Sequence, residues 1–147
     1  MSIKDDVQNA LKAAMKDKDA VRLSCLRMAK GALLLKEKAG PKDRPLSDED
    51  ALHALRAEVK KRQQSMQAFE EVGKPEEVEK LRAEIATIEE FLPKQLDAAA
   101  LAERVRAYLA EHPEIDQAGR LTGAMKKELG DLADGKLLNQ VCREALG

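Results

Sequence analysis

The chain has 147 residues, enough for one domain or two small ones, and its hydrophobic fraction of 44% is ordinary for a folded protein. Aromatic residues make up only 2% of it, and a core of leucine, alanine, valine, isoleucine and methionine favours helices over sheets. The formal net charge is −1, so the overall charge alone does not indicate nucleic-acid binding. Residues 1–46 nevertheless carry 11 basic and 6 acidic side chains, which is compatible with a basic face.

Two helices are expected at the start of the chain. Apolar residues at three- and four-residue steps predict the first over residues 2–16, with Ser2 and Asp5 resembling a capping box. The second is expected over residues 20–39, and its broad apolar surface predicts a central place in the first domain. Gly40 and the prolines after it end this helix. We expect the inward residues of the second helix to be Val21, Leu26, Ala29, Leu33 and Leu34.

A helical hairpin is predicted next. Ser47 and Asp50 form another capping pair at the start of a helix that runs to about residue 72, and a further helix is expected over residues 75–92. Both carry apolar stripes at three- and four-residue steps, and a tight turn at residues 73–75 joins them. Two such stripes predict a long antiparallel hairpin packed like a short coiled coil.

A domain boundary is expected at residues 91–97, because Pro93 stops one helix and Asp97 can cap the next. Three short helices follow, over residues 98–111, 116–129 and 135–146. The predicted fold is therefore all-α, with an N-terminal four-helix domain over 1–93 and a small three-helix C-terminal domain over 97–147. The expected inward residues of the three short helices are Leu101, Val105, Leu109, Leu121, Met125, Leu129, Leu137, Val141 and Ala145.

The segment GDLADGKL, residues 130–137, is one residue away from a nucleotide phosphate loop. No strand pattern precedes it, its two aspartates would put negative charge into an anion cradle, and Leu137 cannot bind magnesium. We therefore interpret it as a joint between helices, where Gly130 ends one helix, Gly135 shapes the turn and Asp134 caps the next helix.

Other site chemistry finds little support in the sequence. His53 and Glu49 supply two potential ligands where zinc needs at least three, and His112 is expected to face solvent. Cys25 and Cys142 lie in helical patterns and are expected to be reduced thiols in a cytosol. We expect no catalytic residue, metal or cofactor. The longest uncharged stretch, residues 63–69, is far too short to span a membrane, so we expect a cytoplasmic protein with no membrane partner.

Two basic groups remain as candidates for binding an anionic partner. The first is Lys60, Lys61 and Arg62, where Arg62 interrupts an apolar stripe. It could therefore recognise a phosphate or carboxylate, or extend its side chain along the edge of a core. The second group flanks the glycines of the last domain and consists of Arg120, Lys126, Lys127 and Lys136. Gly123 lies inside a predicted helix, where glycine is unfavourable, which suggests close approach by another helix or a ligand.

Four segments of the sequence resemble the YqeY-like family. They are AMKDKDAVRLSCLRM (14–28), KKRQQSMQAFEEVGKPE (60–76), EIATIEEFLPKQL (84–96) and TGAMKKELGDLADGKLLNQV (122–141). The C-terminal part of that family is similar to the tail domain of the GatB subunit of tRNA-dependent amidotransferases. The resemblance implies an all-helical protein with a three-helix tail, and it maps the tail motif onto Gly123, Met125, Gly135 and Lys136, with Ala124 at a position where lysine is usual.

The resemblance also implies a function. The amidotransferase tail is associated with tRNA recognition. We therefore expect an accessory protein whose partner is tRNA, another RNA, or a protein of the aminoacylation or amidation machinery. By similarity the family is described as carbon–nitrogen ligases with glutamine as amido-N-donor. The amidase serine signature and the kinase-like cradle domain are absent from the sequence, which leaves the question of enzyme activity open. The alternative is a protein–protein interaction module whose surface is the hairpin over residues 47–92.

Overall fold

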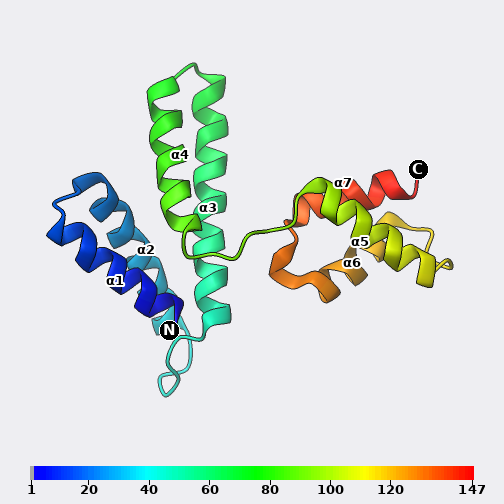
Figure 1. Cartoon of the computed structure of the whole chain (residues 1–147), viewed down its shortest axis with the longest axis horizontal. Helices are drawn as coiled ribbons and strands as arrows, with labels where there is room; N and C mark the ends of the chain where they lie inside the picture. Colours follow the sequence, from blue (N-terminus) through cyan, green and yellow to red (C-terminus); the bar gives the residue numbers. More distant parts are fainter. Residues whose placement is uncertain (1) are drawn as a thin grey trace. The chain divides into compact units, whose positions relative to one another are not determined.

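The computed structural model of the chain describes residues 2–147, and every regular element in that range is helical (Figure 1). The prediction of an all-helical protein is confirmed. The chain forms two compact units, one ending at Leu92 and the other spanning Pro93–Gly147. The first unit contains α1 (Ile3–Lys16), α2 (Ala20–Ala39), α3 (Asp48–Glu71) and α4 (Pro75–Glu89). The second, the tail unit, contains α5 (Ala98–Glu111), α6 (Ala118–Leu129), the 3₁₀ turn η1 (Gly130–Leu132) and α7 (Gly135–Ala145).

Side-chain caps fix where most of these helices begin. Ser2 and Ser47 each accept a hydrogen bond from the backbone N–H three residues later, as the sequence predicts. Asp97 and Asp134 cap α5 and α7 in the same way. Pro75 occupies the first turn of α4, where the missing N–H costs no helical hydrogen bond. Local chemistry therefore accounts for where α1, α3, α4, α5 and α7 begin.

Helix α2 packs against α1, α3 and α4, which agrees with the central place predicted for it. Its buried residues are Cys25, Leu26, Ala29 and Leu33. The expectation that Val21 and Leu34 also point inward is wrong, because their side chains are 70% and 37% exposed. Val21 lies five residues from Leu26, which is about 140° around the helix. Apolar residues cover two faces of α2, and periodicity alone could not choose between them.

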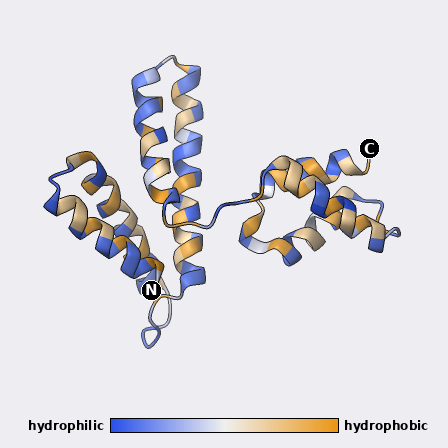
Figure 2. Ribbon diagram, in the orientation of Figure 1, coloured by the Kyte–Doolittle hydropathy of each residue, from blue (hydrophilic) through white to orange (hydrophobic). Residues whose placement is uncertain are grey.

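Helices α3 and α4 run side by side along most of their length (Figure 1) and make the most extensive contact between any two elements. The facing stripes contain Leu55 and Val59 on α3 and Ile85 and Ile88 on α4, all buried. The hydropathy colouring shows polar residues along the free sides of the hairpin (Figure 2). Among the described residues of α3, no large hydrophobic side chain is exposed.

In the tail unit, α5 and α6 each pack against α7. Leu121, Met125 and Leu129 of α6 are buried, as predicted. The buried residues of α7 are Leu138, Val141 and Cys142, and Leu137 packs against the same core, so only the expectation of Ala145 as an inward residue is wrong. Leu137 is half-buried and Ala145 is exposed. Leu137 and Leu138 are both compatible with Val141, at steps of four and three residues, and both pack against the tail core, with Leu138 fully buried.

Candidate nucleic-acid interface

The outward face of α6 carries Arg120, Gly123 and Lys127, spaced three and four residues apart and all exposed. This spacing places them on one side of the helix. A Cβ built on Gly119 or Gly123 would meet no atom within 4 Å. Close approach of another helix of this chain therefore does not explain Gly123. Its place between two cations leaves bare backbone that a ligand could approach.

A second cationic feature lies at the start of α7. The side chain of Lys126 reaches across from α6, and its Cε and Nζ lie 3.6 and 3.7 Å from where a Cβ on Gly135 would stand. Lys136 follows and is exposed. Asp134 accepts a hydrogen bond from Leu137 N–H at 3.0 Å, so its carboxylate is engaged as the helix cap. The positive end of the helix dipole adds to the two lysines.

The segment from Gly130 to Gly135 is a joint between helices, as its sequence indicates. Gly130 has a φ of +56°, which other residues rarely adopt, and it ends α6. The carbonyl of Leu132 accepts a hydrogen bond from Leu96 N–H at 2.8 Å, and that of Asp131 accepts one from the Gln95 amide at 2.9 Å. The backbone of the joint is thereby bound to the segment before α5 rather than arranged around a nucleotide.

Met125 of the tail motif and Pro93 of the predicted domain boundary lie apart from the cations. Met125 is 1% exposed and lies in the core of the tail unit, against the inner sides of α5 and α7. Pro93 begins the tail unit, directly after the last residue of the first unit. Neither residue belongs to the exposed cationic surface, which we define as Arg120, Lys126, Lys127 and Lys136, together with Gly123.

Arg62, a candidate for the first basic group, lies in the interior of the N-terminal unit with 5% exposure. Its Nη1 donates to Glu58 Oε1 at 3.1 Å, and its Nε lies 3.6 Å from Glu84 Oε1. Nη2 contacts the sulfur of Met28 at 3.8 Å. The side chain therefore links α3 to α4 and α2. Of the two alternatives for Arg62, the position agrees with a side chain at the core and not with a phosphate contact, because burial and two carboxylate partners leave the guanidinium inaccessible to RNA.

The neighbours of Arg62 remain on the surface. Lys60 and Lys61 are exposed, and Lys61 Nζ pairs with Glu58 Oε2 at 3.1 Å. Sequence reasoning missed the buried cluster of Glu58, Arg62 and Glu84. The sequence does show Glu58 four residues before an arginine that interrupts an apolar stripe, which is the spacing of an ion pair within one helix. That Glu84 of α4 joins the pair could be known only from the packing of the helices.

A family model described as "Yqey-like protein" matches residues 4–146. The chain belongs to the YqeY-like family. The match extends over both units and includes the whole cationic surface of the tail. Comparison with curated proteins found no match. In the described part of this YqeY-like protein, no helix is both long and apolar enough to cross a bilayer.

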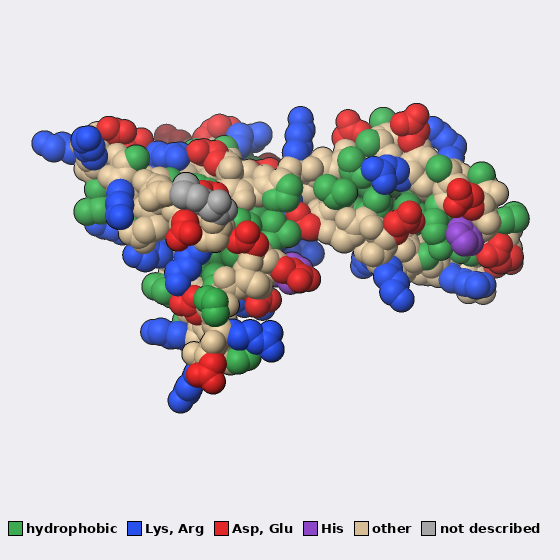
Figure 3. Space-filling model, turned by 60° about the horizontal axis from the view of Figure 1, so that its bottom comes forward, with side chains coloured by type: hydrophobic (Ala, Val, Ile, Leu, Met, Phe, Trp, Pro, Cys, Tyr) green, Lys and Arg blue, Asp and Glu red, His purple; other side chains and the backbone are tan. Residues whose placement is uncertain are grey.

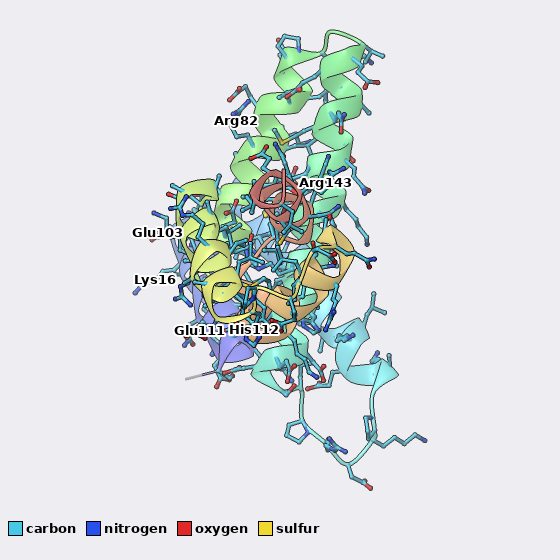
Figure 4. The ribbon with its side chains drawn as sticks, turned by 90° about the vertical axis from the view of Figure 1, so that its right-hand side faces the viewer. Lys16, Arg82, Glu103, Glu111, His112 and Arg143 are labelled. Carbon is cyan, nitrogen blue, oxygen red and sulfur yellow. The ribbon has the colours of Figure 1, made fainter. Side chains whose placement is uncertain are left out.

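The histidine and cysteine side chains considered as site residues have the following surroundings in the YqeY-like chain. Residues 2–147 bring together no group of three side chains able to hold a metal ion. The ring of His112 stacks on Tyr108 at a centroid distance of 4.3 Å, and its Nδ1 lies 3.5 Å from Glu114 Oε1. Figure 4 shows Glu111 and His112 side by side at the end of α5. Burial raises the pKa of the Cys25 and Cys142 thiols, which disfavours the reactive thiolate.

Three glutamates of the N-terminal unit have lowered pKa values. Hydrogen bonds from Arg22 and Lys4 lower the pKa of Glu90 and Glu37. Burial raises the pKa of Glu58, but hydrogen bonds from Lys61 and Arg62 outweigh it and the net shift is downward. The closest atoms of the Arg22–Glu90 pair lie 2.7 Å apart.

We expect these carboxylates to make the N-terminal unit acid-sensitive. A lowered folded-state pKa stabilises the fold above the ordinary glutamate value of 4.5 and ceases to do so as the pH falls through the folded pKa. Urea midpoints measured by circular dichroism should therefore be flat near neutrality and fall below about pH 4.5. Glu90→Gln should show a smaller fall than the unmodified chain, and an equal fall would contradict the contribution of this pair.

Proposed function

We propose that this YqeY-like protein is a non-catalytic accessory protein that binds tRNA or a similar structured RNA through the tail unit. The observation that carries the proposal is the exposed face Arg120–Gly123–Lys127, with Lys126 and Lys136 beside it at the start of α7. The resemblance of residues 122–141 to the tail of the GatB subunit supports a relation to tRNA-dependent amidation. Phosphate contacts from such cations, with backbone accessible between them, suit an RNA strand.

The surface favours RNA over a free nucleotide. The four cations come from two helices and are spread along them, whereas a nucleotide site gathers its phosphate contacts in one loop. Figure 3 shows acidic and basic side chains interspersed on the face it presents, which is consistent with moderate, salt-dependent affinity rather than strong general attraction. Lys60 and Lys61 are a second exposed basic candidate, on α3 of the N-terminal unit, where Lys61 also pairs with Glu58.

The test is charge reversal in the tail. Arg120→Glu with Lys127→Glu should weaken binding of tRNA roughly tenfold at low salt and reduce the slope of log K against log salt by about two, since two phosphate contacts are lost. Fluorescence anisotropy with labelled tRNA over a salt series measures both quantities. The same titration with Lys60→Glu and Lys61→Glu measures the second site.

The matched control is Lys12→Glu with Lys16→Glu, which changes the charge equally at two exposed positions on α1. Its affinity for tRNA should stay close to that of the unmodified chain. Equal losses of tRNA affinity in the control and the tail variant would show that binding is nonspecific electrostatic attraction and not a site in the tail. Binding that does not weaken as salt rises would contradict the proposal directly.

A further inference from the structure

Helix α2 exposes a second apolar face beside its buried one. Val21, Met28 and Leu35 are 70%, 49% and 72% exposed and follow one another at intervals of seven residues. An interval of seven keeps side chains on one stripe of a helix. Leu35 lies nine residues from the buried Leu26, about 180° around the helix. The stripe thus begins at the edge of the buried face, since Val21 lies four residues before the buried Cys25 and the sulfur of Met28 lies 3.8 Å from Arg62 Nη2, and it turns outward toward Leu35.

The concentration of exposed apolar residues on this helix is unusual for the chain. Four of the seven exposed large hydrophobic residues in the described range lie on α2, and none lies on the longer α3. Scattered single residues would need no explanation, but an aligned series does. Ser24 and Gly31 lie between the apolar residues, and a Cβ on Gly31 would meet nothing within 4 Å. Small residues between apolar ones allow a second helix to approach closely.

We propose that the outer face of α2, defined as Val21, Ser24, Met28, Gly31 and Leu35, docks an acidic amphipathic helix of a partner protein. Alternate spacings of three and four residues form the seam of a two-helix coiled coil. The geometry supplies the apolar half of such a seam, and the partner supplies the other half.

Charge selects an acidic partner. Helix α2 carries five basic side chains and one acidic side chain. Arg22 is paired with Glu90, and Glu37 is paired with Lys4. The remaining cations form no ion pair with any residue in the described range, and they are Arg27, Lys30, Lys36 and Lys38. Arg27 and Lys38 lie beside the stripe, whereas Lys30 lies about 200° around the helix from Met28. Two copies of α2 face to face would bring four such cations together, which disfavours self-association.

The composition of the face distinguishes a protein helix from other anionic partners. RNA binding gains little from burying a valine, a methionine and a leucine, and α2 has no aromatic residue on which a base could stack. Membrane-surface helices usually combine a continuous large apolar face with tryptophan or phenylalanine. A seam interrupted by Ser24 and Gly31 instead fits a helix that packs closely along it.

Two synthetic peptides of about three heptads test the proposal. Both carry leucine at the a and d positions, and the flanking e and g positions are glutamate in one and lysine in the other. With the full chain, anisotropy should show binding of the glutamate peptide, weakened by salt, and no binding of the lysine peptide. The triple variant Val21→Ser, Met28→Ser, Leu35→Ser should weaken binding by about tenfold or more.

The control is Val72→Ser, which removes an exposed apolar side chain of 66% exposure away from α2 and should leave peptide binding unchanged. Circular dichroism verifies that both variants stay folded. Equal binding of the two peptides, or no loss in the triple variant, would overturn the proposal. So would sedimentation showing a dimer that the triple variant dissociates, or phosphatidylserine vesicles or tRNA that lose binding in that variant, since each identifies a different occupant.

Discussion

Replacing Arg62 with alanine should lower the free energy of unfolding of the N-terminal unit by about 3 kcal/mol or more. The side chains of Arg62, Glu58 and Glu84 are only 6%, 14% and 16% exposed. The substitution leaves two poorly solvated carboxylates without their cation and opens space beside Met28. Removing one partner of a buried ion pair is far costlier than removing an exposed pair.

The measurement is urea unfolding of the full chain followed by circular dichroism, since the N-terminal unit contains most of the helical residues. Arg82→Ala is the matched control, because Arg82 pairs with Glu79 on the surface at 61% and 70% exposure and should cost below about 1 kcal/mol. The triple variant Arg62→Met, Glu58→Gln, Glu84→Gln should recover part of the loss. A midpoint for Arg62→Ala equal to that of Arg82→Ala would contradict the structural role.

Replacing Leu138 with alanine should unfold much of the tail unit at ambient temperature. Leu138 is fully buried, and a buried leucine reduced to alanine costs about 2–5 kcal/mol. A unit that spans only Pro93–Gly147 has a total stability of about 3–8 kcal/mol at ordinary stability per residue. The substitution therefore removes much or most of the available stability.

Tyr108 provides a specific signal for this experiment, because it is the single tyrosine of the sequence, there is no tryptophan, and it packs against the tail core. Tyrosine fluorescence during urea titration thus follows the tail unit alone. Leu137→Ala is the control, and since Leu137 is half-buried it should cost about 1 kcal/mol. If the Leu137 variant were the less stable of the two, the register of α7 would be wrong.

The limits of the helices could be read from the sequence because they depend on neighbours in the chain. Serine and aspartate caps, Pro75 and Gly130 act through hydrogen bonds and backbone angles within a few residues. Such local interactions are present in any fold that contains these helices. The residues of the tail surface, Arg120 and Lys127, were also found by local spacing, and their binding of RNA stays a prediction.

Inward direction was harder to predict where a helix is apolar on more than one side. Val21 and Leu34 fit helical stripes as well as the residues that the core buries, and only the positions of neighbouring helices distinguish them. Arg62 presents the same difficulty for charge. An arginine that interrupts an apolar stripe can lie at the surface or in a buried ion pair. Arg62 is buried beside Glu84, whose carboxylate comes from another helix and was not predictable from local spacing.

The two buried cysteines divide between the two units, with Cys25 in one and Cys142 in the other, at 3% and 0% exposure. A thiol in such a position reacts with an alkylating reagent only when its surroundings open. The rate at which each cysteine is alkylated therefore reports how often its unit opens, and both rates are measured in the same molecule under the same conditions. The ratio of the two labelling rates orders the opening frequencies of the units without denaturant, added dyes or engineered reporter residues.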